Sequence, residues 1–177
     1  MTIETRSLSD SAIKGIAARI DRPLVLVGMM GVGKSTIGRK LAHLLDLSFR
    51  DADDEIERAA QMSVRRSPKR SSARLLDGGP SVIATGGGAF VQADTRALIH
   101  QKGIAIWLDS DVATLVDRVT RKDNRPLLRG GDPKAIVTRL KAEREAAYAE
   151  APVKVMSDAG PHGEAVIRIL KALNEWL

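Results

Sequence analysis

One stretch near the start of the chain constrains the fold more than any other. Residues 24–36 read LVLVGMMGVGKST, in which Gly28, Gly33, Lys34 and Ser35 match the pattern G-x-x-x-x-G-K-[S/T]. An apolar run precedes the match and residues with helical spacing follow it, which is the strand–loop–helix context that the pattern needs. We therefore expect a βαβ unit with a phosphate-binding loop after its first strand. A chance glycine-rich turn is the alternative.

The residue types of this loop suit the phosphates of a nucleoside triphosphate. Glycine at positions 31 and 33 lets the backbone bend so that consecutive N–H groups point at phosphate oxygens. A helix that begins near Lys34 adds the positive end of its dipole. Lys34 would bring its charge to the β- and γ-phosphates, and the Ser35 hydroxyl can ligate Mg²⁺. The expected nucleotide-binding residues of the loop are Gly31, Val32, Gly33, Lys34, Ser35 and Thr36.

Five short apolar runs along the chain are typical of parallel strands that are covered on both faces. Amphipathic segments lie between them, and strands that alternate with helices indicate βαβ units. We predict an α/β fold with three α/β/α layers and a five-stranded parallel sheet. The expected strands are Pro23–Val27, Leu47–Arg50, Ser81–Thr85, Gly103–Leu108 and Pro152–Met156, and the expected helices are Lys34–Leu45, Asp111–Arg121, Pro133–Glu150 and Ala165–Trp176.

The first twenty residues are interpreted as a helical extension of a single domain over 21–177. Apolar residues recur there at helical spacing behind Asp10, which predicts a short amphipathic helix capped by Ser or Asp. These residues are Ala12, Ile13, Ile16, Ala17 and Ile20. A frayed extension is the alternative.

Acidic residues and glycines follow two of the predicted strands. Asp51 and Asp53 are two residues apart at a strand end, so both can project to one side. One carboxylate near Mg²⁺ and one near a substrate hydroxyl would suit in-line phosphoryl transfer, although a solvated helix start has the same composition. The triplet Gly86–Gly88 lets the backbone approach a ligand at the carboxyl edge of the sheet, where ligands of doubly wound folds bind.

Several classes are excluded or disfavoured. A GTPase would carry the base-reading motif N-K-x-D, which TRKDNR at 120–125 does not match, and an ATPase motor would be longer than 177 residues. A small-molecule kinase is therefore favoured. Asp109 ends the run IAIWLD and could hold Mg²⁺ through water, but DSD before an apolar helix is better interpreted as a cap.

The composition limits partners and location. The absence of cysteine excludes a disulfide scaffold, a Cys-ligated metal and a thiol nucleophile, and it permits a reducing cytoplasm. The net charge is +6, but the tract RRSPKRSSAR at 65–74 supplies +5 of it, so the remainder is nearly neutral. No run approaches the ~20 apolar residues of a membrane span, and the N-terminus lacks the apolar region of a secretory signal.

Five motifs, in this order, resemble those of the shikimate kinase family. They are Gly28–Thr36, DADDEIE at 51–57, VIATGGGAF at 82–90, DNRPLL at 123–128 and EREAAYAEA at 143–151, and the match covers about Pro23–Leu177 except for the basic tract. The family transfers the γ-phosphoryl group of ATP to the 3-hydroxyl of shikimate in aromatic amino-acid biosynthesis. The resemblance implies a P-loop kinase fold, ATP, Mg²⁺ and shikimate as ligands, and a cytoplasmic monomer with no nucleic-acid or membrane partner.

The resemblance also implies roles on the acceptor side. Asp53 would hold the shikimate hydroxyls and act as the base, Asp51 would support Mg²⁺ through water, and Ser35 would ligate the ion directly. Arg144 would pair with the shikimate carboxylate, which a planar guanidinium can grip through two hydrogen bonds. The residues expected to line the shikimate pocket are Gly86, Gly87 and Gly88.

On the nucleotide side, Arg118 resembles the residue that stacks on adenine, and the loop Asp158–His162 resembles the opposite wall. Arg125 would be an arginine of a lid over about 121–133 and would reach the phosphates. With Asp53 and Lys34, Arg125 completes the implied catalytic set.

The tract at 65–74 departs from the family pattern. The family continues there with G-E-x-x-F-R-x-x-E, whose arginine is a second carboxylate ligand, whereas this chain lacks about a dozen residues by comparison. The substrate-binding region over about 56–80 is therefore truncated. The sequence could skip a stretch through a compensated frameshift, the deletion could be real and tolerated, or it could leave a nucleotide-binding remnant. Rival functions are another small kinase, such as a gluconate-type kinase, and a nucleic-acid-binding protein that acts through the tract.

Overall fold

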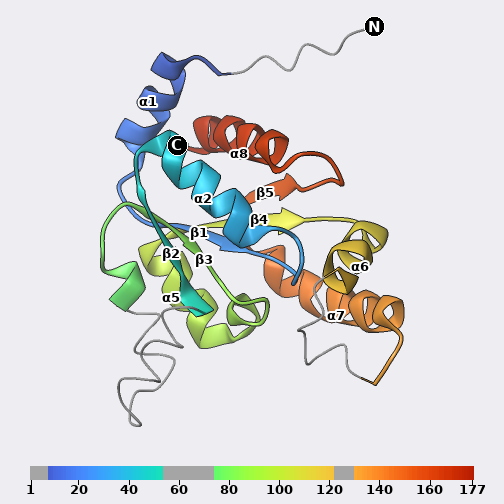
Figure 1. The fold of residues 1–177 in the computed structure, drawn as a ribbon. Coiled ribbons are helices and arrows are strands. Elements are labelled where there is room, and N and C mark those ends of the chain that lie inside the picture. Colours follow the sequence, from blue (N-terminus) through green and yellow to red (C-terminus); the bar gives the residue numbers. More distant parts are fainter. Residues whose placement is uncertain (1–7, 54–73, 122–129) are drawn as a thin grey trace, which may run out of the picture.

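The computed structural model describes residues 8–53, 74–121 and 130–177, whose elements form three layers around a parallel sheet (Figure 1). The strands are β1 Leu24–Val27, β2 Ser48–Asp51, β3 Ser81–Ala84, β4 Ile104–Asp109 and β5 Val153–Met156. The helices are α1 Asp10–Arg19, α2 Lys34–Leu45, α5 Ala93–Lys102, α6 Val112–Thr120, α7 Pro133–Tyr148 and α8 His162–Trp176, and η1 Ala89–Val91 is a 3-10 turn.

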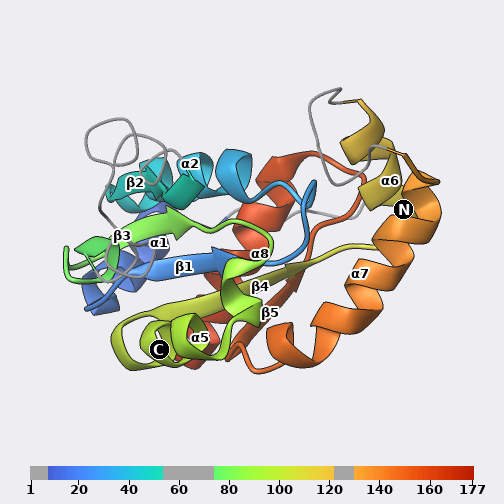
Figure 2. The same ribbon diagram turned by 90° about the horizontal axis from the view of Figure 1, so that it is seen from below.

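The sheet has five strands in the order β2-β3-β1-β4-β5, and each neighbouring pair is parallel. Helices α1, α2 and α8 lie on one side of it, α5 and α7 lie on the other, and α6 lies beside α7 (Figures 1 and 2). The predicted α/β fold with a five-stranded parallel sheet is therefore confirmed. The carboxyl end of β1 leads into the glycine-rich loop, as the sequence indicated.

The strands differ in burial according to their place in the sheet. Every residue of β1, β3 and β4 is buried, because helices cover both faces of these inner strands. The prediction of full burial is wrong for the two edge strands. β2 has no fully buried residue, and β5 alternates buried Val153 and Val155 with exposed Lys154 and Met156.

Local sequence explains how several helices begin. The Ser9 side chain accepts a hydrogen bond from Ala12 N at 3.2 Å and caps α1, whose Ile13 and Ile16 join the core. Asp132 caps α7, which has Pro133 in its first turn. Helix α5 was not predicted, because Ile99 is its one buried residue and its apolar pattern is correspondingly weak. Among the residues described, no helix is long and apolar enough to cross a bilayer.

Candidate active site

The glycine-rich loop joins β1 to α2 in a backbone conformation that favours glycine. Gly28, Gly31 and Gly33 have φ values of 139°, 79° and 102°. A Cβ on Gly28 would lie 2.3 Å from the backbone oxygen of Leu108, so the loop can pass this close to β4 only without a side chain there. Lys34 is buried, and its Nζ donates to the carbonyls of Gly28 and Met29 at 2.8 Å each. The ammonium group is thus held inside the loop.

The start of α2 is joined to the end of β2 by oxygen-bearing side chains. Ser35 Oγ donates to Asp51 Oδ2 at 2.6 Å, and the other carboxylate oxygen of Asp51 accepts from Asp53 N at 3.1 Å. Ser35 and Asp51, the two residues expected to bind Mg²⁺ directly or through water, are therefore hydrogen-bonded to each other. Among the described residues, no three His, Cys, Asp or Glu side chains gather in one place as a metal cluster would.

Sheet register brings Asp53 to the glycine triplet. Asp51 pairs with Ala84 across β2 and β3, so the residues that follow both strands lie side by side. A Cβ on Gly86 would lie 2.8 Å from Asp53 Oδ1, which means that the carboxylate rests against the bare backbone of this glycine. Thr85 precedes the triplet and fixes its start, since its Oγ1 donates to Leu26 O at 2.9 Å. Asp53 is thus placed between the loop and the triplet.

Helix α7 supplies a guanidinium to the same triplet. Nη1 of Arg144 lies 3.3 Å from the position that a Cβ on Gly87 would occupy. One helical turn later, the buried Tyr148 donates from its hydroxyl to the carbonyl of Gly87. Burial raises the pKa of Tyr148, although the charge of Arg144 and a hydrogen bond to it act in the opposite direction. Arg144 and Tyr148 therefore both approach the backbone of Gly87.

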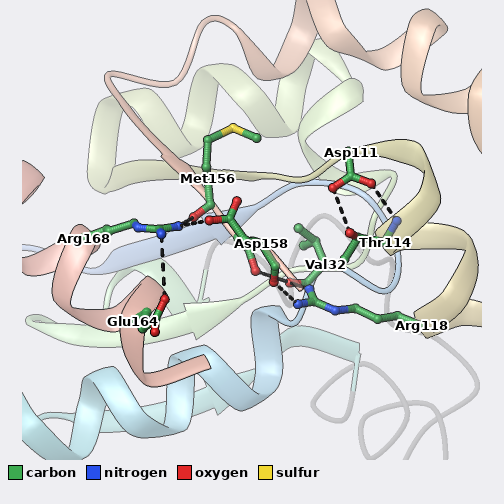
Figure 3. A network of polar contacts seen from close by, with 9 residues as sticks. Val32, Asp111, Thr114, Arg118, Met156, Asp158, Glu164 and Arg168 are labelled. Carbon is green, nitrogen blue, oxygen red and sulfur yellow. Dashed lines mark hydrogen bonds and ion pairs between the residues drawn. The ribbon is translucent and has the colours of Figure 1, made fainter. Parts of the chain in front are cut away.

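Arg118 of α6 ties the glycine-rich loop to the loop after β5 (Figure 3). Its Nη1 donates to Val32 O at 3.0 Å and to Ser157 Oγ at 3.3 Å, and its Nη2 donates to the carbonyl of Asp158. Arg168 of α8 holds the same loop from the other side, since it donates to Met156 O at 3.0 Å and to Asp158 Oδ2 at 2.6 Å. Two arginines thus hold the start of the segment compared with an adenine wall.

One cavity of about 490 Å³ joins most of these groups. Its described lining contains residues from the glycine-rich loop, the acidic pair, the triplet and the loop after β5. The predicted site residues among them are Gly31, Gly33, Lys34, Ser35, Thr36, Asp51, Asp53, Gly86, Gly87 and Arg118. A more apolar cavity of about 310 Å³ lies next to it and shares Asp53, Thr85 and Gly86. The two cavities therefore adjoin at these three residues.

The remaining predicted site residues lie elsewhere. Gly88 lines the second cavity, Arg144 approaches the triplet beside Gly87, and the side chain of Val32 is fully buried. Arg125 falls outside the described residues. Asp109 is paired with lysines, with its Oδ1 2.9 Å from Lys141 Nζ.

The N-cap of α6 is Asp111, as the DSD interpretation predicted, with its side chain accepting from Thr114 N at 2.7 Å.

Sequence reasoning did not assign a site role to Thr85, Ser157 or Tyr148, because each acts through a contact with residues distant in sequence. His162 also lines the large cavity, and its ring lies 2.8 Å from where a Cβ on Gly33 would stand. The only early signal for His162 was its place at the end of the loop Asp158–His162.

These features together define a P-loop kinase that acts on a small molecule. The glycine-rich loop, the Ser35–Asp51 pair, Asp53 and Arg144 all lie at the carboxyl edge of one parallel sheet. A shikimate kinase family model matches residues 30–74 and 65–174.

Curated relatives and a solved structure agree with that match. A shikimate kinase from Novosphingobium aromaticivorans is 55% identical over 96% of both chains, and one from Caulobacter vibrioides is 52% identical over 87% of this chain and 83% of its own length. The structure titled shikimate kinase from Acinetobacter baumannii in complex with shikimate is 30% identical, covers 94% of this chain and 98% of its own, and has a TM-score of 0.79. The chain belongs to the shikimate kinase family. The prediction that it is a kinase of this family is therefore confirmed.

The comparisons also bear on the basic tract. The two matched segments of the family model overlap at 65–74, within the tract itself. The alignment with the Novosphingobium relative spans 186 positions, more than the 177 residues of this chain, so that relative contains residues with no counterpart here. The predicted truncation at the basic tract itself stays a prediction.

Proposed function

We propose that this chain transfers the γ-phosphoryl group of ATP to the 3-hydroxyl of shikimate, with the glycine-rich loop holding the nucleotide and the acceptor lying against the glycine triplet. The observation that carries the proposal is the shared cavity of about 490 Å³, which has Lys34 and Ser35 on one side and Asp53 and Gly86 on the other. A phosphate on the loop and a hydroxyl beside Asp53 would face each other without intervening side chains, as in-line transfer requires.

On the nucleotide side, the backbone N–H groups of residues 31–36 would bind the phosphates. Lys34 would exchange its two carbonyl partners, 2.8 Å away, for phosphate oxygens. Arg118 would provide a flat surface for adenine opposite the loop after β5, which its own hydrogen bonds hold in place. Arg125, which lies outside the described residues, would complete the phosphate contacts from a lid over about 121–133.

A magnesium ion fits the oxygen pair at the start of α2. Ser35 would ligate it and Asp51 would hold its water, because the two side chains are already 2.6 Å apart and offer the hard oxygen donors that Mg²⁺ prefers. When bound, the ion neutralises negative charge on the β- and γ-phosphates.

On the acceptor side, Asp53 would orient the attacking hydroxyl and take its proton. The new bond forms between the shikimate oxygen and the γ-phosphorus, the bond to the β-phosphate oxygen breaks, and ADP leaves. Arg144 would bind the shikimate carboxylate beside Gly87, and Gly86–Gly88 would let the ring approach the backbone. With Lys34 and Arg125, Asp53 makes up the proposed catalytic set.

The part of this proposal that concerns shikimate binding depends on the basic tract at 65–74. We propose one kinase domain over 21–177 with a helical extension at 1–20 and a shortened acceptor region over about 56–80. A remnant that binds nucleotide but not shikimate would have an intact loop with no turnover. Monomeric state and a cytoplasmic location stay predictions.

A coupled assay of ADP release tests the proposal, with shikimate, gluconate and other hydroxy acids offered separately with Mg·ATP. We expect turnover with shikimate alone and calorimetric binding of Mg·ADP. Turnover with gluconate instead would support a gluconate-type kinase, and ADP binding without any turnover would support the remnant. Salt-sensitive DNA binding that disappears when the five basic residues are neutralised would support the nucleic-acid alternative.

A further inference from the structure

Tyr148 occupies an unusual place for a residue on the buried face of a helix. It is 2% exposed, yet its hydroxyl reaches the carbonyl of Gly87 in the glycine triplet. Its ring packs beside Trp107 of β4, with ring centroids 6.0 Å apart. The side chain therefore joins the core to the backbone of the site, and this hydrogen bond satisfies its buried hydroxyl.

Arg144 stands one turn earlier on the same face of α7 and shares this neighbourhood. Its Nη1 is 3.3 Å from where a Cβ on Gly87 would stand, and its positive charge is close enough to oppose the rise that burial causes in the pKa of Tyr148. The Tyr148 hydroxyl and the Arg144 guanidinium thus both lie against the Gly87 peptide, the hydroxyl by a hydrogen bond and the guanidinium by close approach. Without the hydroxyl, the Gly87 carbonyl would lose its hydrogen bond from Tyr148. The long Arg144 side chain would lose a neighbour that limits its rotation.

We propose that Tyr148 is a positioning residue for the acceptor carboxylate, which holds the Gly87 peptide and the Arg144 guanidinium in the arrangement that receives it. This inference rests on the proposed binding of the acceptor carboxylate by Arg144. Tyr148 does not touch the acceptor itself. Its effect should therefore fall on acceptor binding and leave the nucleotide half of the site unchanged.

A second anchor on α7 provides a matched control. Lys141 Nζ lies 2.9 Å from Asp109 Oδ1 and 2.5 Å from Ser110 O, and so ties the helix to the end of β4 three residues before Arg144. Lys141→Met removes this tie, while Lys154 remains 3.2 Å from the Asp109 carboxylate. The control loosens the helix without altering the groups around Gly87.

The experiment compares Tyr148→Phe with Lys141→Met in steady-state kinetics, after thermal melting has shown that both are folded. We expect Tyr148→Phe to raise KM for shikimate about threefold to tenfold, as befits one buried hydrogen bond, with kcat and KM for ATP within about twofold. Lys141→Met should leave all three constants within about twofold. Equal rises of KM for shikimate in both variants, or none in Tyr148→Phe, would overturn the inference.

A second measurement does not depend on turnover. The chain contains one tyrosine, so protein labelled with ¹³C at the tyrosine ζ carbon gives a single resonance that reports on Tyr148. Replacing Arg144 with Ala should shift this resonance at neutral pH, and Lys141→Met should not. A resonance unmoved by Arg144→Ala would refute the link between the two side chains even in an active enzyme. Absence of shikimate turnover in the unaltered protein, with the shift present, would instead count against the proposed function alone.

Discussion

Replacing Gly86 with Ala should impair catalysis while leaving the fold intact. The new methyl group would stand 2.8 Å from Asp53 Oδ1 and 3.4 Å from Oδ2. An ordinary contact requires the carboxylate to move away by roughly 0.6 Å, which its exposed side chain can do at little cost to folding. Because a misplacement of ~1 Å can cost about 100-fold in rate, we expect kcat to fall about tenfold, or ~1.4 kcal/mol.

The assay is coupled ADP release with Mg·ATP and shikimate, alongside calorimetry of ADP binding and thermal melting. Gly86→Ala should bind ADP normally and melt within a few degrees of the parent. The control is Gly15→Ala, in the middle of α1, where no heavy atom lies within 4 Å of the new methyl group. It should gain about 0.5–1 kcal/mol of stability and keep its kinetics. Full activity in a folded Gly86→Ala protein would show that Asp53 does not act from this position.

Three further predictions concern charged groups. Lys34→Met should weaken ADP binding roughly 30-fold or more with little loss of thermal stability, and calorimetry showing unchanged affinity would contradict this. Asp51→Asn should raise the Mg²⁺ concentration for half-maximal rate several-fold without changing KM for shikimate, as measured by Mg²⁺ titration of the coupled assay.

The third prediction follows from the position of Asp109. Burial raises the pKa of Asp109, but hydrogen bonds from Lys141 and Lys154 outweigh it and leave the pKa below 3.8. The stabilisation is therefore complete above about pH 4 and is lost as the pH falls through the lowered value. Asp109→Asn should cost about 1–2 kcal/mol of unfolding free energy at pH 7, and the cost should shrink as the pH falls below 4, as judged by urea titration at several pH values.

The parts of the fold that were predicted correctly are those encoded by adjacent residues. The glycine pattern and the apolar run before it specify a strand, a loop and a helix within thirteen positions, and α2 has the predicted bounds Lys34–Leu45. The caps of α1 and α6 likewise depend on side chains that bond to backbone three residues later. Local chemistry of this kind can be read directly from sequence.

The parts that were missed depend on contacts between distant segments. Short runs do not reveal which strands become edges, so the exposure of β2 and of Lys154 in β5 could not be foreseen. The bond from Tyr148 to Gly87 spans 61 positions, and the pattern of α7 indicated only that the ring faces inward. The spacing of Asp51 and Asp53 predicted a common direction, but only the register of β2 with β3 brings Asp53 against Gly86.

The position of the basic tract predicts an unequal effect on the two substrates. In the proposed site, the nucleotide half would draw on residues 28–36, Arg118 and the loop after β5, all of which lie outside the tract. The proposed acceptor half would use Asp53, which precedes the tract, and Arg144, which lies far beyond it, but would lack the second arginine that the resemblance to the family implies there. Loss of one charge-assisted contact of two costs a few kcal/mol in a partly buried site. Acceptor affinity should therefore depend on Arg144 and on the residues that hold it, while ADP affinity should match that of relatives with the longer segment.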